Sequence, residues 1–209
     1  NTNEDQRVVV NLSGSDIDGD NLTFSLDTDA TNGSVSIDGS IATYTPTSNF
    51  NGSDTFTFSV NDGELSDTAE VTLTIEAVND APVLAVVSDV SFDEDTSGST
   101  SLSASDVDGD DLTYSISGGT DITATLSGSD VSFSASDNFN GSETFTVTVG
   151  DGELSDSQSI TVTVNAVNDA PVATAGLSTT TNEDQSIVIT LSGTDLDGDA
   201  LLYSLDTNA

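Results

Sequence analysis

The chain has almost no basic residues: its 209 residues include 37 Asp and Glu, one Arg, Arg7, and no Lys or His. A formal net charge of −36 excludes direct docking on nucleic acid or on an anionic bilayer, because both need Lys and Arg to neutralise phosphates. The absence of Cys excludes a disulfide framework and a thiolate metal site. Rigidity in an exposed compartment must then come from another kind of cross-link.

Long apolar runs are also missing. No stretch approaches the roughly 20 apolar residues of a membrane helix, so direct membrane insertion is not expected. No signal-peptide pattern opens the chain, and we expect an exported protein to carry its export signal elsewhere in a longer polypeptide.

The sequence offers little for catalysis. Paired carboxylates can in principle run glycoside hydrolysis, but the chain has no His, Cys or Lys to act as base or nucleophile. Its acidic loops repeat identically along the chain, whereas an active site would break that symmetry. We therefore predict that the chain is not an enzyme.

What the chain does contain is an internal repeat. The motif Asp-x-Asp-Gly-Asp begins at Asp16, Asp106 and Asp195, which are 90 and 89 residues apart. Other motifs recur with the same step: an acidic triplet ending at Asp5, Asp95 and Asp184; Asp-Gly-Glu-Leu-Ser-Asp at Asp62 and Asp151; and Val-Asn-Asp-Ala-Pro-Val at Val78 and Val167. This spacing predicts one repeat over 1–81, a second over 82–170, and the N-terminal part of a truncated third over 171–209.

Apolar residues alternate with period two within each repeat, as half-buried strands require. Turn pairs such as Asn32-Gly33 and Asp62-Gly63 separate the alternating runs. The predicted inward sets include Val8, Val10 and Leu12; Leu22, Phe24 and Leu26; Phe56, Phe58 and Val60; and, in the second repeat, Phe145, Val147 and Val149. About seven short strands in roughly 90 residues predict an all-β Greek-key sandwich of the immunoglobulin-like kind. An unrelated small β-barrel is the alternative.

Acidic side chains are concentrated in the predicted loops. Calcium takes 6–8 oxygen ligands from carboxylates, carbonyls and water, and loops rich in Asp, Asn and Gly supply them. Asp-Gly and Asn-Gly are also ordinary turn residues, so a single copy of the motif is compatible with a simple turn. Three copies in register favour a metal site. An EF-hand loop is excluded because its sixth position, normally Gly, is Asn21, Asp111 or Ala200 here.

Together these motifs resemble cadherin repeats, and more closely the cadherin-like repeats of large bacterial surface adhesins. The resemblance rests on the acidic triplet near the start, the Asp-x-Asp after the first strand, the Asp before the last strand and the Asn-Asp-Ala-Pro junction, and it covers the whole chain. It implies tandem calcium-binding sandwiches arranged end to end, with Ca²⁺ between successive modules and ligands from both.

Carried over residue by residue, the resemblance implies two sets of calcium ligands. The first set is Glu4, Asp80, Asp106, Asp108 and Asp151, and the second is Glu94, Asp169, Asp195 and Asp197. The same motifs in their first copy contribute Asp16, Asp18 and Asp62. The family's acidic motif before the penultimate strand has no clean match, and Asp54 and Glu143 are the candidates for it.

The resemblance implies an extracellular, calcium-rigidified spacer or adhesion rod at a bacterial cell surface. Its partners would be calcium ions and neighbouring repeats of the same chain. One alternative is a self-assembling subunit of an extracellular filament or sheath, with homotypic contacts. Another is a polysaccharide-binding module, which is disfavoured because Trp is absent and the few aromatic residues are placed like core residues.

The truncated third repeat poses a separate question. We expect strands over Ile187–Leu191 and Leu201–Leu205, but a two-stranded piece is at best marginally stable in water. The hypothesis is that this segment continues into further sequence or packs against a neighbouring chain that completes the sandwich.

Overall fold

The alternating apolar runs form strands in the computed structural model, which describes residues 1–205. All regular secondary structure in that range is β, and none of it is a helix of the length and apolarity needed to cross a membrane. The predicted all-β immunoglobulin-like class is confirmed. The last four residues of the predicted third repeat lie outside the described residues.

The chain divides into two compact units. Unit 1 comprises Asn1–Ala81 together with Asp106–Asp110, and unit 2 comprises Pro82–Ser105 together with Asp111–Ala209. The Asp-x-Asp-Gly-Asp loop of the second repeat therefore packs as part of unit 1. The repeat boundaries inferred from the sequence, 1–81, 82–170 and 171–209, stay a prediction.

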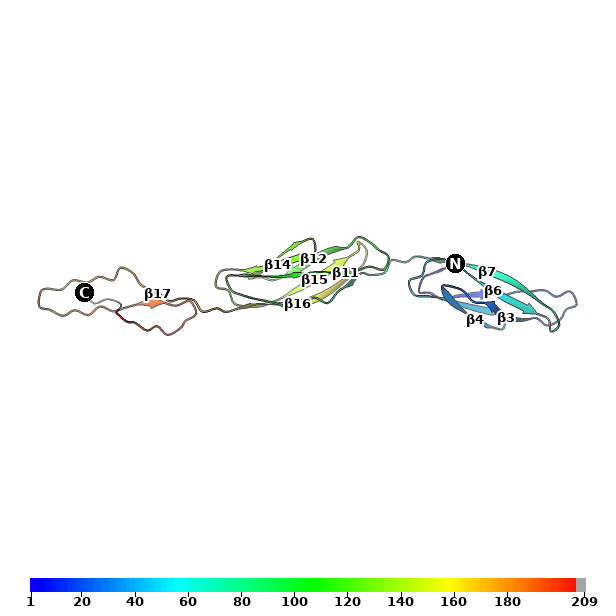
Figure 1. Ribbon diagram of the computed structural model, residues 1–209, viewed down its shortest axis with the longest axis horizontal. Helices are drawn as coiled ribbons and strands as arrows, with labels where there is room; N and C mark the ends of the chain where they lie inside the picture. The colour runs from blue at the N-terminus through cyan, green and yellow to red at the C-terminus, as the bar shows by residue number, and fades with distance from the viewer. Residues whose placement is uncertain (206–209) are drawn as a thin grey trace. The chain divides into compact units, whose positions relative to one another are not determined.

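Unit 1 is a sandwich of two sheets (Figure 1). One sheet has the order β1-β7-β6-β3 and the other the order β2-β5-β4, with β1 parallel to β7 and the other pairs antiparallel. The chain changes sheets between β1 and β2, β2 and β3, β3 and β4, and β5 and β6, as in a Greek key. The bounds are β1 Thr2–Asn3, β2 Val8–Asn11, β3 Thr23–Thr28, β4 Gly33–Asp38, β5 Ile41–Pro46, β6 Gly52–Asn61 and β7 Ser66–Glu76.

Unit 2 repeats this plan with two additional two-stranded ladders, β8 with β11 and β17 with β18. Its sheets have the orders β12-β15-β16-β9 and β10-β14-β13, and β8 pairs with β11. The bounds are β8 Val83–Leu84, β9 Val90–Asp93, β10 Ser97–Ser101, β11 Ala104–Ser105, β12 Thr113–Gly118, β13 Ile122–Ser127, β14 Asp130–Ala135, β15 Gly141–Gly150 and β16 Ser155–Asn165. Between β16 and residue 205, where the described part of the chain ends, the strands are β17, Val172–Ala173, and β18, Gly193–Thr194.

The core of each unit lies between its two sheets. Phe56, Leu73 and Ile75 are buried in unit 1, and Phe145 and Val162 are buried at matching places in unit 2, as the alternation predicts. The sequence analysis did not assign the central strand of the second sheet. This strand is β5 in unit 1 and β14 in unit 2, and each contributes one fully buried ring, Tyr44 and Phe133 respectively.

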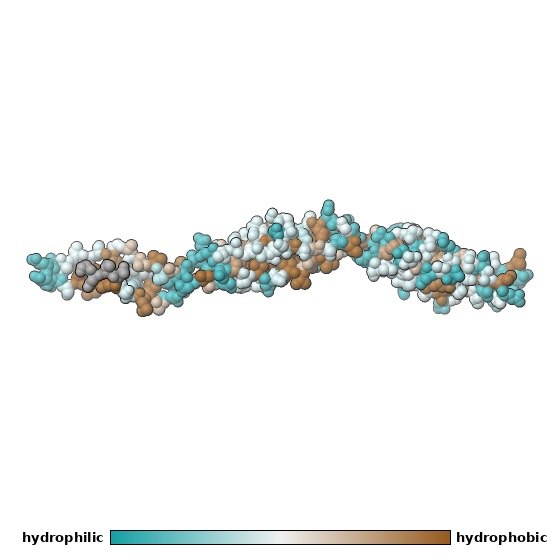
Figure 2. All heavy atoms as spheres, in the orientation of Figure 1, coloured by the Kyte–Doolittle hydropathy of each residue, from teal (hydrophilic) through white to brown (hydrophobic). Residues whose placement is uncertain are grey.

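The predicted strands over Ile187–Leu191 and Leu201–Leu205 are not formed. A strand needs a hydrogen-bonded neighbour. By the repeat these two segments correspond to β2 and β3, which pair with β5 and β6, and residues 171–205 include no counterparts of β5 and β6. The apolar residues predicted to face inward are exposed as a result: Ile187 at 43%, Ile189 at 49% and Leu191 at 44%. Hydrophobic residues appear as brown patches at this end of the chain in Figure 2.

Asp54 of β6 is buried and fastens the loop between β3 and β4. Its carboxylate accepts the N–H groups of Thr31, Asn32 and Thr55 at 2.9–3.2 Å and the hydroxyl of Tyr44 at 3.0 Å. Burial by itself raises the pKa of the Asp54 carboxyl, but these hydrogen bonds together outweigh it and lower the pKa below its usual range. Burial and the Asp54 carboxylate raise the pKa of Tyr44.

We expect Asp54→Asn to lower the free energy of unfolding of unit 1 by about 1–3 kcal/mol at pH 7, because the amide leaves buried donors without an acceptor. Since the folded pKa of Asp54 is depressed, its contribution is complete above the ordinary Asp pKa of about 3.9 and is lost as the pH falls through the folded value. Denaturant unfolding at pH 7 and pH 3 measures both effects. Tyr44→Phe, which removes one donor only, should cost less than Asp54→Asn. A loss for Asp54→Asn that is equal at both pH values would contradict the assignment.

Candidate metal centre

Each Asp-x-Asp-Gly-Asp segment folds around its first carboxylate. In the second copy, Asp106 Oδ1 accepts the N–H groups of Asp108, Gly109 and Asp110 at 2.9, 3.0 and 3.3 Å. Gly109 has φ of +81°, which a residue with a Cβ rarely adopts. The first copy makes the same three bonds to Asp16 Oδ1, and the third makes the bond from Asp199 to Asp195. This turn leaves the second carboxylate oxygen of Asp106 free to face another group.

The acidic triplet at the start of unit 1 places a buried glutamate beside this loop. The N–H of Glu4 donates to the carbonyl of Glu76 at 2.9 Å, which continues the pairing of β1 with β7, and Asp5 then turns the chain with φ of +57°. Only 3% of Glu4 is exposed. Its Oε1 accepts the N–H of Val78 at 2.5 Å.

Three carboxylates converge in unit 1. Glu4, Asp80 and Asp108 each place one oxygen within 4.8 Å of the others, and the N–H of Asp80 donates to Asp108 Oδ2 at 2.8 Å. Asp106, Asp108 and Asp110 form a second group of this kind, which shares Asp108 with the first. All five residues belong to unit 1.

These two groups contain carboxylate oxygens that have no hydrogen-bond donor. Glu4 Oε2, Asp80 Oδ2 and Asp106 Oδ2 are buried and unpaired. Burial raises the pKa of the Asp80 carboxyl, and the charges of Asp108, Asp5, Glu4 and Asp106 raise it further. Buried anionic oxygens are costly without a cation, and a set made only of carboxylates suits a hard divalent ion. The residues therefore fit a metal.

The same arrangement occurs once more in unit 2. Glu94, Asp169 and Asp197 bring their oxygens within 4.8 Å, and the N–H of Asp169 donates to Asp197 Oδ2 at 2.6 Å. Glu94 is 4% exposed, and its Oε1 accepts the N–H of Val167 at 2.5 Å. Burial, then the charges of Asp197, Asp95, Glu94 and Asp195, raise the pKa of Asp169. Two acidic clusters that can bind a metal thus follow the repeat.

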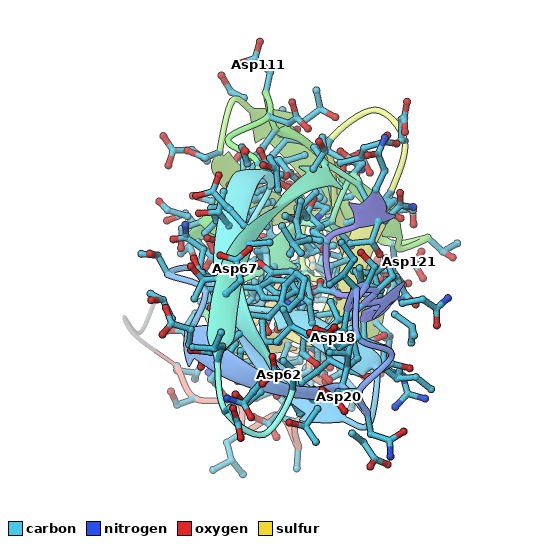
Figure 3. The ribbon with its side chains drawn as sticks, turned by 90° about the vertical axis from the view of Figure 1, so that its right-hand side faces the viewer. Asp18, Asp20, Asp62, Asp67, Asp111 and Asp121 are labelled. Carbon is cyan, nitrogen blue, oxygen red and sulfur yellow. The ribbon has the colours of Figure 1, made fainter. Side chains whose placement is uncertain are left out.

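Other residues proposed as ligands lie outside these groups of the described chain. Asp62 and Asp151 close the turns of the long hairpins: Oδ1 of each accepts two N–H groups of its own turn at 2.7 Å. Glu143 accepts the N–H groups of Thr120, Asp121 and Ile122 at 2.9–3.1 Å, and Asp54 is satisfied as described above. Asp16 and Asp18 share a turn at the end of unit 1 that Figure 3 faces. A metal-binding role for these residues stays a prediction.

The sequence analysis missed one member of the clusters and one backbone turn beside them. Asp110 belongs to the group with Asp106 and Asp108, and it was readable from the last position of the motif itself. The left-handed turn at Asp5, repeated at Asp95 with φ of +59°, follows the buried glutamate in each unit. Asp5 and Asp95 each accept an N–H group, from Asn49 and Asn138, which holds the turn. Sequence spacing marked the triplet but not this conformation.

Comparison with known proteins places the fold in a described family. The bacterial Ig domain family matches residues 1–74 and 79–164. The chain is 35% identical over 123 residues to chitinase A of Pseudoalteromonas piscicida, which covers 55% of the chain and 14% of that protein. It is 31% identical over 245 aligned positions to integrin beta-like protein A of Dictyostelium discoideum, which covers 93% of the chain and 12% of that protein. The chain therefore spans a small part of either relative.

Among solved structures, the chain is similar to human protocadherin-24 EC1-2, with 17% identity and a TM-score of 0.48 over 75% of this chain and 88% of that one.

In chelator, repulsion among the carboxylates around Asp80 should lower the stability of unit 1. Asp80→Asn should raise the melting temperature of unit 1 in chelator at pH 7, because the amide removes one charge from a site where burial and four neighbouring carboxylates oppose ionisation. Since the folded pKa of Asp80 is raised, the penalty is absent below the ordinary Asp pKa and appears as the pH rises through the folded value. The gain should therefore vanish at pH 3.5.

Calorimetry of the wild type, Asp80→Asn and Asp38→Asn tests this at both pH values. Asp38 is an exposed residue at the end of β4 and outside both groups, so its variant should leave the melting temperature unchanged. Equal stabilisation by the two substitutions would assign the effect to net charge rather than to the cluster.

Proposed function

The chain belongs to the bacterial Ig domain family, and on that basis we propose that it is a calcium-rigidified repeat region of an extracellular bacterial surface protein. In this role the repeats act as a spacer or adhesion rod, and they carry no catalytic activity. The duplication of the acidic clusters supports the proposal, because a spacer needs the same chemistry in every repeat.

The observation that carries the proposal is the set of buried oxygens without donors at Glu4, Asp80 and Asp106. Folding has taken these oxygens out of water, and Arg7, the only basic side chain in the sequence, donates no hydrogen bond to them. A bound Ca²⁺ would supply the missing positive charge. Glu4, Asp80, Asp106, Asp108 and Asp110 offer enough oxygens for the 6–8 ligands that calcium takes.

The ligands come from parts of the chain that are distant in sequence. Glu4 and Asp80 are in the first repeat, whereas Asp106, Asp108 and Asp110 are in the second. Calcium at this cluster would hold the Asp106–Asp110 loop in unit 1, and both ends of that loop continue into unit 2. We propose that calcium in this way limits the motion of one repeat with respect to the next. Glu94, Asp169 and Asp197 would do the same for the second and third repeats.

Calcium should raise the melting temperature of the chain strongly, because an ion that binds only the folded state adds its binding free energy to stability. Magnesium should be a poor substitute, since it requires compact octahedral coordination and loses its waters reluctantly. Calorimetry in calcium, in magnesium and in chelator measures both effects. Equal stabilisation by the two ions at millimolar concentration would rule out a calcium site of this kind.

Paired substitutions test the two clusters separately. Asp106→Asn with Asp108→Asn should remove the calcium response at the first cluster and leave the second nearly intact. Asp195→Asn with Asp197→Asn is the matched pair by sequence and should do the reverse, because Asp197 belongs to the second cluster and Asp195 opens its loop. Isothermal titration counts the ions lost in each variant. A uniform loss at both clusters would contradict independent sites.

Small-angle scattering tests the mechanical part of the proposal. Calcium should narrow the distribution of distances between repeats relative to chelator, while the far-ultraviolet circular dichroism keeps its strand signal, because each core is built from its own unit. A collapse of strand signal in chelator would mean that the metal holds the cores together instead.

A further inference from the structure

A groove lies on the outer face of the sheet β10-β14-β13 of unit 2, whose central strand β14 is labelled in Figure 1. Its volume is about 320 Å³. The lining residues are Ser99, Thr100 and Ser101 of β10, Thr125 and Ser127 of β13, and Asp130, Val131 and Ser132 of β14. Unit 2 contains counterparts of all seven strands of unit 1, so no missing strand of the repeat accounts for the groove.

The pairing of the three strands arranges the exposed side chains of the groove in two rows. One row is Ser99, Ser132 and Thr125, and the other is Ser101, Asp130 and Ser127, each in the order β10, β14, β13. Neighbouring strands lie about 4.8 Å apart, and residues two apart on one strand are separated by about 6.7 Å. Five hydroxyls and one carboxylate therefore stand on a regular grid.

The polar groups of this grid are available to a ligand. Ser101 Oγ donates to Asp130 Oδ1 at 2.7 Å, which orients the carboxylate, and Ser132 Oγ donates to the carbonyl of Thr125 at 3.4 Å. Asp130 is exposed, and none of the hydrogen bonds within residues 1–205 goes to its Oδ2. The groove thus offers hydrogen-bond donors and acceptors at fixed places.

Unit 1 presents a different chemistry at the same place. By strand register, Val9 stands at the position of Ser99 and Ile41 at the position of Asp130, and both apolar side chains are exposed. Of the two units, unit 2 alone carries the grid of hydroxyls, whereas the acidic clusters occur in both. A repeated spacer does not need this difference, which indicates a role particular to unit 2.

The composition of the groove selects the class of ligand. No basic side chain lines it, and the net charge of −36 repels acidic and sulfated molecules. An apolar ligand would remove water from the polar side chains without replacing its hydrogen bonds. A single carboxylate supplies little of the charge that a calcium site needs. A molecule with many uncharged hydroxyls fits, because each of them both donates and accepts.

We propose that this groove binds uncharged hexose units of a polysaccharide. Asp130 Oδ2 would accept a hydrogen bond from one sugar hydroxyl, and the hydroxyls of Ser99 and Thr125 would bond to its neighbours. The groove has no aromatic ring, so it would bind by hydrogen bonds instead of the stacking that Trp provides. The affinity of one groove should be weak, about 1 mM, because water competes for each bond. This inference does not rest on the proposed role of calcium.

The first test is a titration of the full chain followed by nuclear magnetic resonance. Chelator is present so that no metal bridges a sugar to a carboxylate. At least one of three neutral oligosaccharides, hexamers of glucose, mannose and galactose, should shift the amides of Ser99, Thr125 and Asp130. An anionic hexamer of galacturonate should not. Absence of these shifts with all three neutral hexamers would overturn the proposal. Shifts with a cationic glucosamine hexamer alone would also overturn it, because they would assign binding to charge attraction.

Substitutions taken from unit 1 should remove the site. Ser99→Val and Asp130→Ile change exposed strand positions to β-branched residues, which strands accommodate, so the fold should be kept. Each should weaken sugar binding by about tenfold or more, since a sugar hydroxyl would then face an apolar group. Ser159→Val, exposed on β16 in the opposite sheet, is the matched control and should leave the affinity unchanged. Equal effects of Ser99→Val and Ser159→Val would count against the groove.

The reverse substitutions should create a second site in unit 1. Val9→Ser, Asp38→Ser and Ile41→Asp together reproduce the grid there, with Asn11 at the position of Ser101. All three changed residues are exposed, so the sandwich should be retained. The same neutral hexamer should then shift amides of unit 1 as well as those of unit 2. A folded variant that binds sugar through unit 2 alone would refute the assignment of binding to these side chains.

Discussion

A buried carboxylate must find hydrogen-bond donors or a cation, and this chain has a single Arg to serve 37 acidic side chains. Ion pairing is therefore closed to nearly all of them. The structure uses backbone N–H groups instead wherever it can: Asp54 and Glu143 each accept three, and Asp106 accepts three from its own loop. Carboxylates therefore hold these loops in place by accepting hydrogen bonds from the backbone.

The carboxylate oxygens that lack backbone donors lie in the acidic clusters. Glu4 and Asp80 each keep one buried oxygen without a donor, and the raised pKa of Asp80 reflects burial and the negative charges around it. The polypeptide alone leaves this region under electrostatic stress, and a divalent cation would relieve it. The same backbone chemistry thus accounts both for the carboxylates that shape the fold and for those available to a metal.

The two units differ in the residues that satisfy the buried polar groups at equivalent positions. Tyr44 in unit 1 needs an acceptor for its buried hydroxyl and finds it in Asp54. Unit 2 has Phe133 at that place, which needs none, and Glu143 replaces Asp54 and reaches only to backbone N–H groups. Likewise the amide of Gln158 in unit 2 donates to the backbone carbonyls of Leu84 and Ala85, whereas unit 1 has Ala69, which has no polar side chain, at that position. Near-identical motifs therefore produce units with different surfaces.

The sequence by itself determined the fold class, because alternation with period two and the spacing of Gly-containing turns leave a β-sandwich as the natural packing. It also identified Glu4, Asp80 and Asp108 as a set, although through motif resemblance rather than geometry. Only the tertiary structure decided which carboxylates meet, because convergence depends on contacts between residues as distant as Glu4 and Asp108. It separated those from Asp54 and Asp151, whose oxygens are engaged by backbone N–H groups. It also showed that the predicted strands over 187–191 and 201–205 do not form, because a strand exists only through a neighbour that sequence patterning cannot supply.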